Sequence, residues 1–241
     1  MFEILKSVRG LALAALIAMT FTGAASAGTV TKSNIDQMSG WQHCTVCAGT
    51  NGAGSVAPYS MQQNVSSPSM DGKSVRFNLG GTNNYSNALW WKQLGGDSAK
   101  HNFKYDVYFY LKNPGAAQAL EFDVNQSTGG RKYIFGTQCS MKRGTFDIWS
   151  ASTSWIHTSI SCTGARTAYK WHHLVWEFQR TSDKRVKFVS VTLNGVKHYL
   201  NKTYNSKSSG SSEINVAFQM DGDKYQTDYT TWLEKVKLTY W

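Results

Sequence analysis

The sequence predicts an all-β protein built as a two-sheet antiparallel β-sandwich, with little helix outside its first residues. Three observations predict this fold. Aromatic residues make up 13% of the chain, which also has 21 Gly but only 3 Pro. Charged residues make up 17%, below the typical quarter, so the sequence lacks the excess of Ala, Glu, Lys and Leu that long helices need. From residue 74 onward, apolar and polar residues alternate in short windows separated by turn residues.

Residues 1–27 have the features of a secretory signal peptide. Lys6 and Arg9 precede an apolar run at 11–21, which ends in small residues before Gly28. The run is shorter than the roughly 18 apolar residues of a membrane helix, and no other window reaches that length, so we expect no membrane span. The sequence therefore predicts a secreted protein, periplasmic or extracellular.

Export affects how the four cysteines are interpreted. An oxidising compartment favours disulfides, and we expect Cys44 to pair with Cys47 and Cys139 with Cys162. A redox pair or half of a zinc site at the C-x-x-C is the alternative. Cys139 and Cys162 do not form a second C-x-x-C, however, so zinc would lack matching ligands.

The chain divides into three expected segments. The signal peptide is followed by residues 28–73, which carry the C-x-x-C and are expected to pack on the sandwich, and then by the sandwich domain at 74–241. The strand windows of that domain are, in order, 75–79, 88–94, 103–111, 120–126, 133–138, 146–149, 171–179, 186–193, 196–200, 214–220 and 232–241.

Turn residues separate these windows. Proline occurs only between them or before the first. Asn194-Gly195 joins two adjacent windows and predicts a tight hairpin, because Asn-Gly tolerates positive φ at both central positions. The stretch 202–212 is rich in Ser, Lys and Gly and predicts a surface loop.

Alternate residues of a strand share a face, which identifies candidate functional side chains. In 120–126 the apolar residues point to the core, so Glu121, Asp123 and Asn125 share the open face. In 171–179 the same rule turns His173 and Glu177 outward. The full candidate set for a carbohydrate site is Tyr108, Tyr110, Glu121, Asp123, Asn125, Gln126, Trp149, His173, Glu177 and Gln219.

Carboxylates, amides and flat rings on one surface are suited to sugars, because hydroxyl groups form paired hydrogen bonds and C–H faces stack on aromatic rings. The alternative is an ordinary solvated sheet, which also alternates polar and apolar residues. Two carboxyl groups about 5 to 5.5 Å apart would suit a retaining hydrolase, so Glu121 and Glu177, with Asp123, are the candidate catalytic residues if the protein is an enzyme.

Four segments resemble the concanavalin A-like lectin/glucanase superfamily. They are Leu-Glu-Phe-Asp-Val-Asn-Gln at 120–126, the aromatic strand at 171–178, the hairpin at 191–197 and the closing strand at 236–241. The resemblance covers most of 74–241 and implies a jelly-roll fold and a carbohydrate ligand.

Two branches of that superfamily match in part. Laminarinase-type glucanases carry E-x-D-x-x-E, in which the first Glu is the nucleophile and the last the acid/base. Glu121 and Asp123 match, but Gln126 replaces the last Glu, and an amide cannot exchange a proton as a carboxyl group does. Legume lectins use a similar segment to bind metal, which Glu121, Asp123 and Asn125 would match. Their downstream Asp-Pro and His-Ile-Gly elements are absent.

The sequence therefore predicts a lectin-like protein that binds a polysaccharide or cell-surface glycan. A glycan-cleaving enzyme, either a glycoside hydrolase or a polysaccharide lyase, is the alternative. No cofactor or metal is expected, although calcium at Glu121 and Asp123 or at Asp221-Gly-Asp223 stays open. The net charge of +10 favours an anionic partner such as an acidic glycan, and the scattered basic residues do not indicate nucleic acid.

Overall fold

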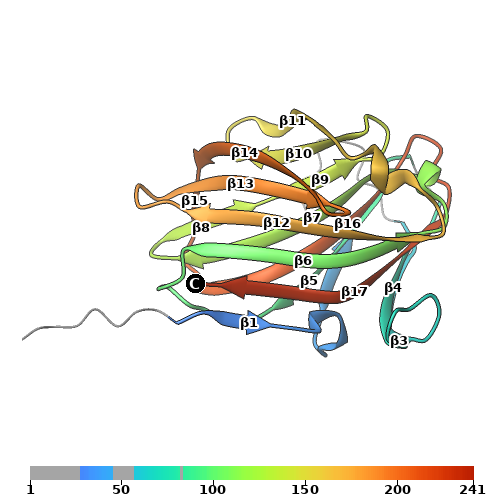
Figure 1. The fold of residues 1–241 in the computed structure, drawn as a ribbon, viewed down its shortest axis with the longest axis horizontal. Coiled ribbons are helices and arrows are strands. Elements are labelled where there is room, and N and C mark those ends of the chain that lie inside the picture. The colour runs from blue at the N-terminus through green and yellow to red at the C-terminus, as the bar shows by residue number, and fades with distance from the viewer. Residues whose placement is uncertain (1–27, 46–56, 82–83) are drawn as a thin grey trace, which may run out of the picture.

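The computed structural model describes residues 28–45, 57–81 and 84–241, and in these ranges two antiparallel sheets lie face to face (Figure 1). The prediction of an antiparallel sandwich is confirmed. The helical elements in the described ranges are the short 3-10 turns η1 (Ile35–Gln37), η2 (Pro114–Ala116) and η3 (Thr163–Arg166). The described residues include no helix with the length and apolar character of a membrane span. The predicted signal peptide lies outside them.

Sheet A is the sheet in front in Figure 1. Its spatial order is β14 (Val196–Asn205), β13 (Arg185–Leu193), β12 (Lys170–Arg180), β6 (Asn102–Leu111), β17 (Tyr229–Tyr240), β4 (Ser74–Leu79) and β3 (Tyr59–Val65), and β1 (Val30–Lys32) also pairs with β17.

Sheet B lies behind it. Its order is β11 (Ser154–Ser161), β10 (Thr145–Ser150), β9 (Thr137–Ser140), β7 (Ala117–Thr128), β16 (Glu213–Gly222), β5 (Asn87–Gln93) and β2 (Gln42–Thr45), and β8 (Arg131–Phe135) pairs with both β7 and β15 (Lys207–Ser208).

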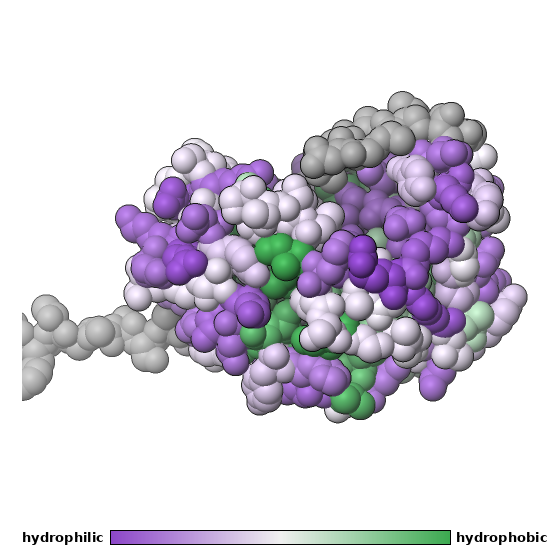
Figure 2. All heavy atoms as spheres, turned by 90° about the horizontal axis from the view of Figure 1, so that it is seen from above, coloured by the Kyte–Doolittle hydropathy of each residue, from purple (hydrophilic) through white to green (hydrophobic). Residues whose placement is uncertain are grey.

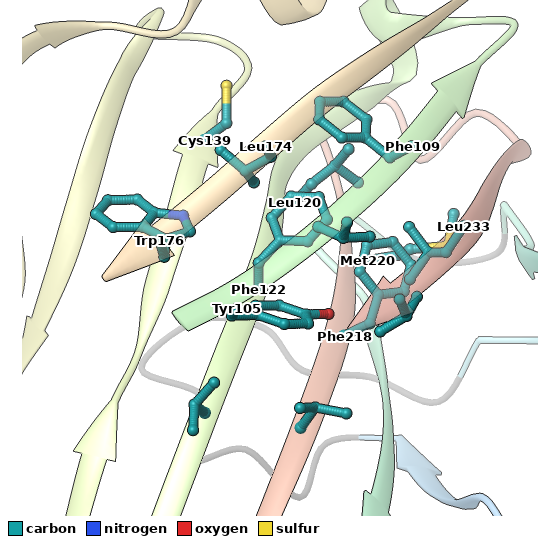
Figure 3. Close-up of a cluster of buried hydrophobic side chains, with 14 of the residues drawn as sticks. Tyr105, Phe109, Leu120, Phe122, Cys139, Leu174, Trp176, Phe218, Met220 and Leu233 are labelled. Atoms are coloured by element: carbon teal, nitrogen blue, oxygen red, sulfur yellow. The ribbon is translucent and has the colours of Figure 1, made fainter. Parts of the chain in front are cut away.

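The core forms where the apolar faces of the two sheets meet. Leu120 and Phe122 of β7 project toward sheet A, as the alternation predicts, and both are fully buried (Figure 3). The Phe122 ring lies 5.2 Å from that of Phe109 on β6 and 5.4 Å from that of Phe218 on β16, measured between centroids. The pair with Phe109 joins the two sheets, while the pair with Phe218 packs neighbouring strands of sheet B, so both fix the inward face of β7.

The residues before Ser74 contribute strands to both sheets. β1 and β3 join sheet A, while β2 pairs with β5 at the edge of sheet B. Of the two expected disulfides, Cys139–Cys162 is confirmed and joins β9 to the residue that follows β11. The other involves Cys47, which lies outside the described residues.

Several strand bounds differ from the expected windows. Asn194 and Gly195 have φ of 50° and 86°, which confirms the hairpin between β13 and β14. β14 continues to Asn205 and is followed by β15, so part of the expected loop at 202–212 is strand. β11 was not expected. Figure 2 looks onto the edge formed by β11 and β14 and shows a mainly hydrophilic surface with apolar side chains gathered near its centre.

Candidate functional site

The outer face of sheet B carries a groove of about 450 Å³, which we call the sheet B groove. Its lining combines three kinds of side chain and one cation. The carboxyl groups are Glu121, Asp123 and Asp221, the amides are Asn87, Gln118, Asn125 and Gln219, the aromatic rings are Tyr85, Trp149 and Trp155, and the cation is Lys207.

The strand register explains how these side chains meet. In the antiparallel pair β7–β16, Glu121 lies opposite Gln219, and Asp123 lies opposite Ala217. Period 2 then places Asp221, two residues beyond Gln219, on the same face. Ala217, whose side chain is small, lines the groove beside Asp123.

One side of the groove is aromatic. Trp149 on β10 and Trp155 on β11 are cross-strand partners, and their rings meet edge to face at 5.4 Å between centroids. Gly136 makes room for them, since a Cβ at that position would lie only 2.8 Å from the Cβ of Trp149. The Lys207 ammonium lies 5.9 Å from the centroid of the Trp149 ring and completes this wall.

Gln219 holds the carboxyl cluster together. Its Nε2 donates to Glu121 Oε1 at 2.7 Å and to Asp221 Oδ1 at 2.9 Å. The Asp221 carboxyl group is also near enough to that of Glu121 to raise the pKa of Glu121. Asp123 Oδ1 accepts the backbone N–H of Thr137 at 2.8 Å. The three carboxyl groups are therefore fixed in place by neighbouring strands.

Burial raises the pKa of all three groups. Desolvation raises the pKa of Asp123 to about 7, although the hydrogen bond from the Thr137 N–H acts to lower it. Desolvation also raises the pKa of Asp221 to about 6. The pKa of Glu121 is raised well above its usual value, first by burial and then by the charges of Asp221 and Asp123. Burial therefore favours the proton-bearing form of these carboxyl groups, which places candidate acids and bases side by side.

The polar track continues beyond Glu121 across sheet B. Gln138 lies opposite Glu121 in the β7–β9 register, and its Nε2 donates to Asp147 Oδ2 at 2.8 Å. His157 Nδ1 lies 3.0 Å from the same oxygen. Asp147 is fully buried, while 47% of the His157 side chain is exposed. A fixed carboxylate thus orients a half-exposed imidazole on the groove side of the sheet.

Five of the predicted carbohydrate-binding residues lie together in the sheet B groove. They are Glu121, Asp123, Asn125, Trp149 and Gln219. Asn125 Nδ2 donates to Asn215 Oδ1 at 3.0 Å, so its amide is oriented by β16.

Four others lie on the outer face of sheet A, on the opposite side of the molecule. Tyr108 stacks on His173 with ring centroids 4.3 Å apart, and His173 Nε2 lies 2.9 Å from Asp106 Oδ1. The Glu177 carboxylate accepts a hydrogen bond from Ser190 and forms an ion pair with Lys197. Burial acts to raise the pKa of Glu177, but these two contacts outweigh it, and the pKa is lowered. Tyr110 is on β6, beside Tyr108.

The expected pair of Glu121 and Glu177 is therefore wrong. Glu121 is on β7 of sheet B and Glu177 on β12 of sheet A, and both point away from the core between them. Period 2 identified the outward residues of each strand correctly. It could not determine the sheet to which each strand belongs.

Gln126 is also misplaced by the sequence prediction. The β7–β16 register runs without a shift from Ser127 to Ala119, so Gln126 falls on the inner face with Val124 rather than beside Asp123. Its side chain is fully buried, and Nε2 donates to the carbonyls of Asp97 at 2.8 Å and Lys100 at 3.0 Å. Gln126 is an anchor for the loop before β6 and has no access to the groove.

The carboxyl groups named for calcium already have protein partners. Asp221, near the end of β16, faces the groove and accepts from Gln219. In the turn after β16, Asp223 Oδ2 is paired with Lys142 at 2.7 Å. Asp223 Oδ1 accepts two backbone N–H groups, so its oxygens already have partners.

Four residues that line the sheet B groove were not among those predicted from the sequence. Trp155 lies on β11, a strand that was not expected, although its spacing from Trp149 across a short turn was a usable signal. Asp221 extends the period-2 series of Asn215 and Gln219 by one step. Tyr85 and Lys207 come from segments outside the expected windows, and no sequence pattern indicated them.

No protein-family model matches this chain, and no curated protein matches it either. Among solved structures, the endo-β-1,4-glucuronan lyase of the fungus Trichoderma reesei is similar with a TM-score of 0.52 and 11% sequence identity, over 86% of this chain and 94% of the lyase. Arcelin-5, a lectin-like defence protein from Phaseolus vulgaris, gives a TM-score of 0.50 and 10% identity, over 88% of this chain and 98% of arcelin-5. At such identities the likeness shows the fold alone, a jelly-roll sandwich similar to those of these two structures.

Proposed function

We propose that the protein binds a glycan in the sheet B groove. The observation that carries this proposal is the meeting of an aromatic wall, Trp149 and Trp155, with a row of fixed amides and carboxyl groups at Asn125, Glu121 and Gln219. Sugar rings present apolar C–H faces and polar edges, and this groove offers a surface for each. The likeness in fold to a glucuronan lyase and to a lectin-like protein supports this choice of ligand.

The charge of the groove favours an uncharged glycan. Three carboxyl groups line it against one cation, Lys207. A uronate or sulfate placed beside Glu121 and Asp221 would add negative charge at a buried acidic cluster, where like charges repel strongly. Neutral hydroxyl groups can instead donate to the carboxyl oxygens and accept from the amide groups that line the groove. The acidic glycan suggested by the net charge does not suit this groove.

Binding is tested by titrating soluble neutral β-glucans and xylans into the protein and into Trp149→Ala. Loss of a stacked ring should weaken binding by about tenfold, since one such contact is worth on the order of 1 to 2 kcal/mol. Trp171→Ala is the matched control, because Trp171 is a partly exposed ring on the outer face of sheet A. Equal losses in both variants, or no binding across a broad neutral glycan array, would refute the proposal.

Glycan cleavage is the second candidate, and the adjoining carboxyl groups of Glu121, Asp221 and Asp123 in the groove favour it. A carboxyl group whose pKa is raised by burial can protonate a glycosidic oxygen, and Asp123, two residues along the same strand face, supplies a second carboxylate. In this mechanism Glu121 is the acid, Asp221 orients it, and Asp123 acts as the nucleophile or activates water.

Cleavage is tested by the release of reducing ends from the glycans that bind. Glu121→Gln should abolish turnover while binding stays within a few fold, because the amide keeps the shape of the carboxyl group but cannot transfer its proton. Glu177→Gln, on the opposite face, should leave turnover unchanged. Binding without any release of reducing ends by the natural protein would leave the groove as a binding site alone.

A further inference from the structure

We propose that the outer face of sheet A, at the β13–β14 hairpin, is a second binding site that takes an acidic polysaccharide. We call residues 184–205 the basic hairpin. From residue 184 to residue 212 the chain contains no Asp or Glu, while Lys and Arg occur at 184, 185, 187, 197, 202 and 207. Lys207 faces the sheet B groove, and the other five belong to the hairpin.

The basic hairpin is largely exposed to solvent on β14. β14 is the terminal strand of sheet A, and most of its side chains are exposed. Tyr199 is 68% exposed, and the Lys197 ammonium lies 5.1 Å from its ring centroid. An exposed ring beside a cation is a surface on which a sugar ring can stack while its acidic group approaches the ammonium.

Few carboxylates neutralise this surface. Glu177 of β12 is paired with Lys197, and Asp183 lies 3.9 Å from Arg185. Among the described residues, the side chains of Lys184, Lys187 and Lys202 form no ion pair with an acidic group. Lys184 and Lys187 therefore remain free for an anionic ligand at this edge of the sheet. Lys202 lies opposite the buried Phe188 in the β13–β14 register, so it is on the inward side of β14.

A hollow of about 640 Å³ lies on this face and gives the ligand a defined seat. Its basic lining residues are Arg180, Arg185, Lys187 and His101, and its one acidic lining residue is Asp183. Its amide and hydroxyl groups include Gln179, Asn201 and Thr203. Arg185 Nη2 donates to the Thr203 carbonyl at 3.1 Å, which holds the guanidinium in place. Fixed guanidinium and ammonium groups beside amides are suited to a carboxylate or sulfate carried on a hydroxyl-rich ring.

The two binding surfaces are opposite in charge as well as in position. Acidic groups line the sheet B groove, and the free cations lie across the sandwich on sheet A. Part of the net charge of +10 therefore lies on sheet A, on the side of the molecule opposite the sheet B groove. The Cys139–Cys162 disulfide is typical of an oxidising compartment, where polysaccharides are the abundant polyanions and nucleic acid is not, so the hairpin is assigned to an acidic polysaccharide.

The experiment measures binding of polygalacturonate and heparin to the full protein by titration calorimetry at low and high salt. Binding should be present at low salt and weaken as ionic strength rises, because exposed charges are screened. Lys184→Ala with Lys187→Ala should reduce the affinity at least tenfold. Neither side chain has an ion-pair partner among the described residues, so folding should be preserved, and Lys187→Glu provides a second variant with a larger expected loss.

The matched control is Lys32→Ala with Lys73→Ala, which removes the same charge near the opposite edge of sheet A, at β1 and just before β4. It should change the affinity less than twofold. Equal losses in the two double variants would overturn the site, as would tighter binding of single-stranded DNA or anionic vesicles than of either polysaccharide at the same salt. Trp149→Ala should leave polyanion binding unchanged, so this test is independent of the groove.

Discussion

At the scale of single residues, Gln126 shows how a motif match can mislead. Its spacing from Glu121 matches a catalytic triplet, but that triplet needs a bulge to bring its third member to the open face, and β7 has no shift there. The sequence could predict the orientation of Leu120 to Asn125 from period 2. It could not show whether the strand was regular at Gln126.

We expect Gln126→Glu to destabilise the fold and to create no hydrolase. The amide donates to the carbonyls of Asp97 and Lys100, and a carboxylate would place an unpaired charge against both. The cost should be about 3 kcal/mol or more in urea unfolding. Asn125→Asp, one residue away but facing the groove, should cost less than about 1 kcal/mol. Unchanged stability of the Glu variant would show that Gln126 is not an internal anchor.

Gly136 is the second informative residue. A Cβ there would lie 2.8 Å from that of Trp149, so Gly136→Ala should displace the indole and weaken glycan binding several fold. Gly115→Ala is the control, because its Cβ would meet nothing closer than Asn113 Oδ1 at 3.5 Å. Calorimetric titration with a bound glucan measures both. Full affinity in the Gly136 variant would mean that the position of Trp149 does not matter.

At the scale of elements, most strands were predictable and their grouping into sheets was not. The windows from 75 to 241 anticipated β4 to β7, β10, β12 to β14, β16 and β17, because buried strands alternate strongly. β3 and β11 were missed since they are edge strands with partly exposed, weakly apolar faces. The assignment of β7 to sheet B and β12 to sheet A depends on long-range pairing, which local sequence does not encode.

The Cys139–Cys162 disulfide should stabilise the part of sheet B that carries the aromatic wall. It closes a separation of 23 residues that contains β10 and β11. Replacing both cysteines with serine should lower the free energy of unfolding by about 3 kcal/mol in the chain-entropy model. Hydrogen exchange should quicken most at Trp149 and Trp155. A uniform increase across both sheets would instead indicate that the bridge has no local role.

At the scale of the whole molecule, the buried carboxyl cluster makes stability depend on pH. Asp123 has a folded pKa of about 7, well above its unfolded value near 4. The folded state therefore binds more protons than the unfolded state between these values, and stability falls as pH rises from about 4 to about 7. Asp123→Asn removes the titrating group. The free energy of unfolding of this variant in urea, minus that of the natural protein, should therefore be larger at pH 8 than at pH 5. A difference that is the same at both pH values would contradict the raised pKa.

The most direct test of glycan binding in the sheet B groove follows the indole N–H signals of the tryptophans by NMR during titration with a neutral glucan that binds. Signals are assigned by single Trp→Phe changes. Trp149 and Trp155 should shift together and saturate with the same dissociation constant, because they form one wall of the groove. Trp171, on the other sheet, should stay fixed. Movement of Trp171 with no change at Trp149 or Trp155 would show that the glycan binds elsewhere.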